Sequence, residues 1–166
     1  FFVNYENPGA QTITFAKNQR LIPAKAEKKK EYIKIKMQDS EKETELLFCH
    51  NQDAKASYDV FDANKLFSLT ETTEPYFLTE NIALVKEEVN ILPYTATINI
   101  RNNQSKEITL SVENIPEGIS VFLLDNGYDV KMNNGEKYIT RITEGENANR
   151  FQLLIKKAHR IESIDS

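Results

Sequence analysis

The chain has 166 residues, and 40% of them are apolar, including nine Phe and seven Tyr, which is enough for a packed core and excludes wholesale disorder. Its 21 basic and 25 acidic residues give a formal net charge of −4, so neither nucleic acid nor an anionic membrane surface is an expected partner. No apolar run approaches the ~18 residues that a membrane span needs, and we expect no membrane insertion.

The single cysteine and the start of the chain set two further expectations. Cys49 alone excludes an internal disulfide and a Cys-cluster zinc site. The chain opens on Phe1-Phe2-Val3, without an initiator Met or a signal peptide, so we expect a piece of a longer precursor or a matured product. We predict one β-domain over residues 1–157, with the attachment of residues 1–30 left open, and a C-terminal tail over residues 158–166.

Alternation of apolar and polar side chains predicts the strands in chain order. Ile33, Ile35 and Met37 alternate with two lysines and a glutamine, the period of two that marks a half-buried strand. The chain returns through residues 46–49 and then runs in a long loop over residues 50–74. Further strands are predicted at residues 76–79, 82–85, 98–100, 108–112, 119–123 and 151–155.

Turn residues separate these strands. Asn7-Pro8-Gly9 is one turn, and Ile115-Pro116-Glu117-Gly118 places Pro second and Gly fourth, which suits a type I turn. Asp125-Asn126-Gly127 and Asn133-Asn134-Gly135 carry the Asn-Gly dipeptide of tight hairpins. Roughly ten short strands, with turn signals every ~8–12 residues, predict an all-β fold, specifically an antiparallel, jelly-roll-like β-sandwich.

Adjacent polar pairs on strands fail as catalytic groups, because neighbouring side chains of a strand point to opposite faces. Cys49 and His50 therefore form no dyad, and the only other histidine, His159, lies in the tail. Glu87 and Glu88 likewise diverge and do not flank one bond as a glycosidase requires. The sequence has no nucleophile elbow and no phosphate-binding Gly loop. We predict no enzyme and no cofactor; a catalytic domain would need a cleft with a convergent polar group of perturbed pKa.

Aspartates in the long loop raise the question of a hard cation, since calcium binds carboxylate and carbonyl oxygens. Asp53, Asp59 and Asp62 do not have the spacing of an EF-hand, because Tyr58 stands where its turn Gly belongs and Asn64 where its bidentate Glu belongs. The other interpretation is that these aspartates cap turns through their own backbone. We predict no metal site and leave open a surface calcium near Asp59 and Asp62.

Exposed tyrosines are the binding candidates, because sugar-binding surfaces are commonly aromatic and the chain has no Trp. Most tyrosines in strands are packing residues with a solvated hydroxyl. Tyr128, beside a hairpin tip, and Tyr94, directly after Pro93, are the two that we expect to be exposed, and we take them as candidate binding residues.

Several segments, in order along the chain, resemble a family of exported Bacteroidetes surface modules. Residues 58–67 (YDVFDANKLF) resemble that family's YDxxDAxKL segment, and residues 149–153 (NRFQL) resemble its closing strand, N/D-R-F-x-L-x-F. Lesser likenesses lie at residues 75–78, 91–93 and 119–125.

This resemblance implies a jelly-roll-like sandwich near the C-terminal end of a long secreted or outer-membrane-associated protein, without catalytic residues. The motif residues are expected to be structural; they are Tyr58, Asp59, Asp62, Lys65, Arg150 and Phe151. To Asp59, Asp62, Lys65 and Arg150 we assign turn capping and an ion pair that ties the long loop to the last strand.

The leading interpretation is therefore a non-catalytic β-sandwich module of a secreted or cell-surface bacterial protein, acting in adhesion, export or architecture, with an unidentified protein or glycan as its partner. The alternative is a carbohydrate- or protein-binding accessory module of a larger secreted enzyme, which an exposed row of tyrosines on one sheet face would favour. A fibre subunit that donates Phe1-Phe2-Val3 as a strand to its neighbour is a further alternative.

Overall fold

A computed structural model describes residues 30–69 and 72–159 of the chain. The chain divides after Lys30 into two units, and every described strand belongs to the second unit, Glu31–Ser166. The expected turn at Asn7-Pro8-Gly9 and the expected donated strand Phe1-Phe2-Val3 lie outside the described residues.

The second unit is built from strands alone, which confirms the all-β prediction. Among the described residues there is no helix of the length and apolarity that crossing a membrane requires. The strands are β1 (Ile33–Gln38), β2 (Glu43–His50), β3 (Ala63–Asn64), β4 (Glu74–Thr79), β5 (Ile82–Val89), β6 (Tyr94–Asn102), β7 (Lys106–Glu113), β8 (Ile119–Asp125), β9 (Tyr128–Met132), β10 (Lys137–Ile142) and β11 (Gly145–Lys157).

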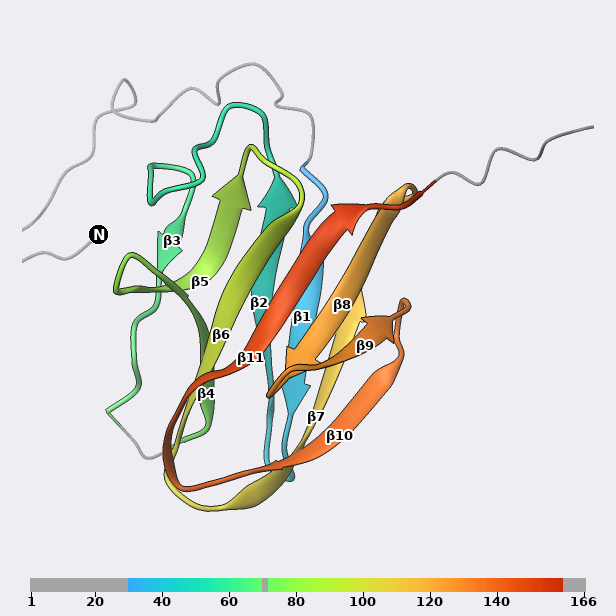
Figure 1. Cartoon of the computed structure of the whole chain (residues 1–166). Helices are drawn as coiled ribbons and strands as arrows, with labels where there is room; N and C mark the ends of the chain where they lie inside the picture. Colours follow the sequence, from blue (N-terminus) through green and yellow to red (C-terminus); the bar gives the residue numbers. More distant parts are fainter. Residues whose placement is uncertain (1–29, 70–71, 160–166) are drawn as a thin grey trace, which may run out of the picture. The chain divides into compact units, whose positions relative to one another are not determined.

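All of these strands belong to one sheet, in the order β10-β7-β1-β2-β5-β4-β6-β11-β8-β9, with β3 paired to β5. The sheet is mixed, because β2 and β5 run parallel while the other strand pairs are antiparallel. Figure 1 shows the sheet curling round until β9 and β10 lie close together, so that it is nearly closed into a barrel. Two separate antiparallel sheets, as a sandwich requires, are not seen among the described strands.

The turn after β9 brings the two ends of this sheet together. Asn134 bridges to Val112 of β7, and the Gly135 N–H donates to the Val112 carbonyl at 2.8 Å. Since β7 is the neighbour of β10 at the opposite end of the strand order, these contacts link the two ends.

The core fills the interior of the curled sheet and follows the alternation that the sequence predicts. In β1, the buried residues Ile33, Ile35 and Met37 alternate with half-buried or exposed ones. Burial of a side chain of this size contributes ~1.5–3 kcal/mol. The largest fully buried side chains include Phe48, Phe77, Phe151, Met37, Leu46, Leu84, Ile98, Ile100, Ile108, Leu110, Leu123 and Ile142.

Two of the three turn predictions in the second half of the chain need correction. Asn126-Gly127 joins β8 to β9 as predicted, with φ of 50° and 87°, the left-handed conformation that this two-residue hairpin turn requires. Asn133-Asn134-Gly135 makes a turn but no hairpin, because β9 pairs with β8 and β10 with β7. The turn at Pro116 is not type I: the Ile119 N–H donates to the Pro116 carbonyl, which puts Gly118 third with φ 78°, as in a type II turn.

Candidate functional site

Strand β5 carries two adjacent carboxylates that are both buried, Glu87 and Glu88, each only 1% exposed. The parallel register with β2 pairs Glu87 with Phe48 and Glu88 with Cys49, so the two carboxylates lie on opposite faces of the sheet. The prediction that they diverge is confirmed. Buried carboxylates are rare without partners, and this pair is therefore the candidate site of the molecule.

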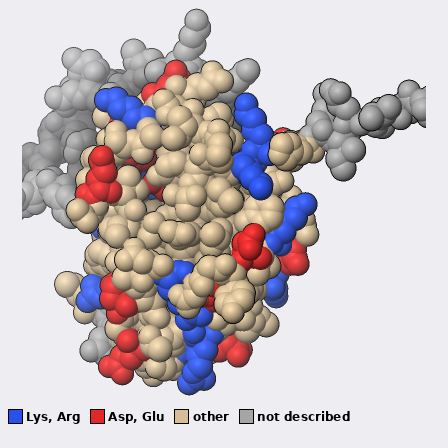
Figure 2. Space-filling view, viewed as in Figure 1, with Lys and Arg blue, Asp and Glu red and all other residues tan. Residues whose placement is uncertain are grey.

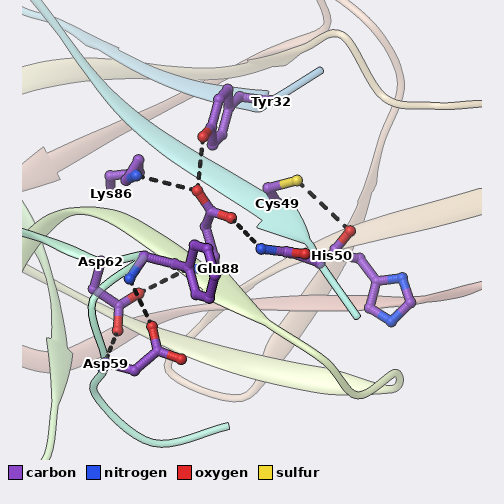
Figure 3. Close-up of polar contacts among 9 residues, drawn as sticks. Tyr32, Cys49, His50, Asp59, Asp62, Lys86 and Glu88 are labelled. Atoms are coloured by element: carbon purple, nitrogen blue, oxygen red, sulfur yellow. Dashed lines mark hydrogen bonds and ion pairs between the residues drawn. The ribbon is translucent and has the colours of Figure 1, made fainter. Parts of the chain in front are cut away.

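Glu88 lies on the outer face and is saturated with donors (Figure 3). Its Oε1 accepts hydrogen bonds from the Tyr32 hydroxyl at 2.7 Å and from the Lys86 ammonium at 3.1 Å. Its Oε2 accepts one from Asn51 Nδ2 at 2.8 Å. Three donors, one of them the charged Lys86, satisfy this buried carboxylate, so Glu88 of β5 holds the residue before β1 and the residue after β2.

The long loop is fixed over this face by Asp59 and Asp62. The Asp62 carboxylate accepts the Glu88 N–H at 2.9 Å and the Asp59 N–H at 2.9 Å, while the Asp59 carboxylate accepts the Lys55 and Phe61 N–H groups. Burial raises the pKa of Asp62, although the N–H groups of Glu88 and Asp59 oppose that shift.

These contacts are the turn capping that the sequence predicts for Asp59 and Asp62, and they bear on the open question of calcium. All four carboxylate oxygens of the two residues already accept backbone N–H groups. In the part of the chain that the structure describes, no group of three or more His, Cys, Asp or Glu side chains is arranged to hold a metal ion.

Glu87 lies on the inner face, against the aromatic core. Its Oε1 accepts hydrogen bonds from the Tyr94 hydroxyl at 2.8 Å and from Thr79 Oγ1. Its Oε2 has no hydrogen-bond partner among the described residues. Burial raises the pKa of Glu87, more strongly than the two hydroxyl donors lower it.

Tyr94 is part of this inner site and not an exposed side chain, contrary to the prediction. Its ring stacks on Phe48 with centroids 5.9 Å apart and packs against the core. Burial, and then the nearby carboxylate of Glu87, raise the pKa of Tyr94. Tyr128 is 78% exposed, as predicted.

A pocket of about 230 Å³ adjoins the Phe48–Tyr94 stack at the end of the curled sheet. Cys49 and His50 contribute to its wall, but in Figure 3 the His50 imidazole points away from the Cys49 thiol. The thiol donates a weak hydrogen bond to the His50 carbonyl at 3.6 Å. The Cys49 thiol and the His50 imidazole therefore do not form a dyad, and His159 is exposed beyond β11. The lining residues are Glu31, Ile33, Phe48, Cys49, His50, Leu92, Pro116, Ile119 and Ile155.

The predicted ion pair between the long loop and the last strand is wrong. Lys65 pairs with Glu74 of β4 at 3.1 Å. Arg150 of β11 instead binds Asp125, the last residue of β8, through Nε and Nη2. Phe151 is fully buried, and the Arg150 guanidinium lies 4.6 Å from the centre of its ring.

Tyrosine hydroxyls and carboxylates pair throughout the described structure. Besides the pairs at Glu87 and Glu88, the Tyr76 hydroxyl donates to Glu146 at 2.7 Å and the Tyr138 hydroxyl donates to Asp125 at 2.9 Å. Only Tyr58 and Tyr128 are exposed among the described tyrosines, and they lie on different elements. The described strands therefore present no row of exposed tyrosines.

Exposed apolar side chains gather instead in residues 58–69, which we call the apolar segment. Of the eight large apolar side chains exposed in the described residues, five lie here, and Val60 and Leu66 are 91% and 78% exposed. The members are Tyr58, Val60, Leu66, Phe67 and Leu69. Figure 2 shows basic and acidic side chains interspersed on the visible face, with no continuous area of one sign.

The sequence did not reveal that both β5 carboxylates are buried. The only signal was their place in Ile82–Val89, where apolar residues flank the two acids on the same strand. Comparison of the chain with protein-family models, with curated proteins and with solved structures found no match.

Proposed function

We propose that this chain is a non-catalytic module of a secreted or cell-surface protein, where it acts in adhesion or architecture by contacting another protein. In this proposal the curled sheet is a rigid, jelly-roll-like body that carries a contact surface and performs no chemistry. The apolar segment is the observation that carries the proposal.

Contact with water is unfavourable for large apolar side chains. Where such side chains have no role, they are usually scattered singly over the surface of a soluble protein. In the apolar segment five of them lie within twelve residues of one another along the chain, on either side of β3. A protein partner that covers them gains ~25 cal/mol for each Å² of apolar surface removed from water.

The polar groups of the described structure support a structural role for them. Tyr32, Tyr76, Tyr94 and Tyr138 donate to carboxylates, and Asp59 and Asp62 hold backbone N–H groups. These four tyrosines are buried or half-buried, so their rings do not form the exposed aromatic platform that a sugar stacks on. This distribution favours a protein over a glycan as the partner.

The surface part of the proposal is tested on the source cells. An antibody raised against the purified chain should label intact cells as strongly as permeabilised ones. Labelling that requires permeabilisation overturns the assignment to the cell surface.

The contact is tested with beads coated with the purified chain. Beads carrying V60S/L66S/L69S should attach to source cells at least about tenfold less than wild-type beads, because the three Ser side chains remove apolar surface whose burial contributes ~25 cal/mol per Å². The matched control is I91S/I139S, which removes exposed apolar side chains outside the apolar segment. Circular dichroism must show that both variants keep the fold.

Pretreatment of the cells separates the two kinds of partner. Protease treatment of the cells should abolish attachment, and periodate oxidation of their glycans should leave it intact. The reverse pattern, or equal attachment of all three bead types, overturns the proposal.

A further inference from the structure

The inner carboxyl, Glu87, has surroundings that suit a neutral acid and not an ion. It is 1% exposed, and both of its donors, the Tyr94 hydroxyl and Thr79 Oγ1, converge on Oε1. Its Oε2 is buried and has no hydrogen-bond partner among the described residues. An ionised carboxylate would place half of its charge on this buried oxygen, which is strongly unfavourable.

The groups that face Glu87 add no positive charge. From β6 comes the Tyr94 phenol, from β4 the Thr79 hydroxyl and from β2 the Phe48 ring. The Asp62 carboxylate, which lies over the outer face, adds a negative charge that acts on Glu87 through space. No Lys, Arg or His forms an ion pair with Glu87 in the described residues. The contrast with Glu88, one residue along the same strand, is direct, because Glu88 has Lys86 and donors on both oxygens.

We infer that Glu87 is a neutral carboxylic acid in the folded module at neutral pH, and that its ionisation is a pH-sensitive switch in the core. In this state the hydrogen bond with Thr79 reverses: the proton lies on Oε1 and is donated to Thr79 Oγ1, which now accepts, while the Tyr94 hydroxyl still donates to the same Oε1. Oε2 is then an uncharged carbonyl oxygen, for which the lack of a partner costs far less than for a carboxylate oxygen.

Ionisation places a negative charge beside the stacked rings of Phe48 and Tyr94, with the Asp62 carboxylate nearby. Phe48 also lines the pocket at the end of the curled sheet. Loss of the proton therefore loosens the packing of Phe48 and Tyr94 and changes the shape of this pocket. The inference is independent of the proposed contact through the apolar segment.

The protonation state is read directly from the Cδ chemical shift of Glu87, in protein labelled with ¹³C at glutamate, with the assignment made by E87Q. At pH 7 the shift should be that of a neutral carboxyl group, whereas Glu88 should give that of a carboxylate. A carboxylate shift for Glu87 at pH 7 overturns the inference, whatever the variants do.

Stability supplies the second readout. Because burial raises the pKa of Glu87, the folded chain retains a proton that the unfolded chain loses. The contribution of this proton to the free energy of unfolding is complete below the pKa of Glu87 in the unfolded chain, and it is lost as the pH rises through the pKa in the folded chain. Urea midpoints of the wild type should fall with rising pH in this window. In E87Q the fall should be smaller by the amount that corresponds to one proton released on unfolding.

E88Q is the matched control, since it removes the neighbouring buried carboxylate and leaves Glu87 in place. It should retain the wild-type fall in urea midpoint with rising pH. An E87Q variant that folds and shows the same fall as the wild type overturns the inference.

Discussion

Arg150 holds Asp125 in a two-pronged ion pair, with Nε 2.7 Å from Oδ1 and Nη2 2.8 Å from Oδ2. The same guanidinium donates to the Arg141 carbonyl at 2.6 Å and to the Thr140 hydroxyl at 2.8 Å. Arg150 therefore connects β11 both to β8 and to β10, which stands at the other end of the strand order. Together with the Tyr138 hydroxyl, which donates to the same Asp125 carboxylate from β10, Arg150 joins the two ends of the curled sheet.

Replacement of this arginine should weaken the contacts that join β8 and β11 to β10. R150A should lower the free energy of unfolding by about 2–3 kcal/mol, because it leaves the largely buried Asp125 carboxylate without its cation. R150K should recover only part of this, since an ammonium does not make the two-pronged contact. Chemical denaturation measures the loss.

The control for this pair is R141A, whose exposed side chain can be removed without touching the carbonyl that Arg150 uses. It should stay within ~0.5 kcal/mol of the wild type. Equal losses of unfolding free energy for R141A and R150A would contradict the stabilising role given to the contacts of Arg150 with Asp125 and β10.

Asp39 should make the module sensitive to acid. Burial opposes the ionisation of Asp39, but the N–H groups of Glu41 and Lys42 and the ammonium of Lys106 outweigh it and bring the pKa to about 2. A pKa lowered in the folded state adds stability above the unfolded pKa, and this is lost as the pH falls through the folded pKa. The wild type should exceed D39N by about 2 kcal/mol at pH 7, and by little at pH 2.

Urea unfolding of wild type and D39N between pH 2 and pH 7 checks this window. D53N, a change at an exposed loop aspartate, should give curves parallel to those of the wild type. A difference between wild type and D39N that does not vary with pH would mean that Asp39 acts through its shape and not its charge.

Asp62 should control the local stability of the long loop. D62A removes the acceptor of both the Glu88 and the Asp59 N–H groups, which costs about 1–3 kcal/mol for each amide left buried without a partner. Hydrogen exchange at Phe61 and Lys65 should speed up accordingly, while exchange in β7 stays slow. Unchanged exchange in the loop would show that other contacts hold it.

The hydroxyl of Tyr94 should matter for stability and that of Tyr128 should not. Y94F removes a donor to the buried Glu87 and should cost about 1–1.5 kcal/mol. Y128F, at a side chain 78% exposed, should be neutral within ~0.5 kcal/mol. Thermal unfolding compares the two, and equal effects would contradict the placement of Tyr94 in the core.

The sequence was most informative where one face of a strand is buried. β1 and β7 alternate strictly, and both were predicted. β9 and β10 were not predicted as alternating segments, because they are largely exposed and Ile139 of β10 points to solvent at 61% exposure. β3 spans only Ala63–Asn64, too short for any period to be visible.

Contacts between distant segments set the features that the sequence left hidden. The parallel pairing of β2 with β5 places Phe48 beside Glu87, and the local sequence of neither strand predicts this pairing. Arg150 was recognised as structural, but its partner Asp125 was not, because the closure of the sheet decides which carboxylate comes within reach. The capping by Asp59 and Asp62 was predictable since its contacts are mostly local.

The position of β11 has a consequence for synthesis of the chain on the ribosome. Although it is the last described strand in sequence, it lies between β6 and β8 and pairs with both along much of its length. Until Lys157 has emerged, the β8–β9 hairpin lacks β11, the described strand that pairs it with β6 and the remainder of the sheet. The nascent chain must therefore wait with two open edges and complete the folding of this sheet in a late step, after β11 has been translated.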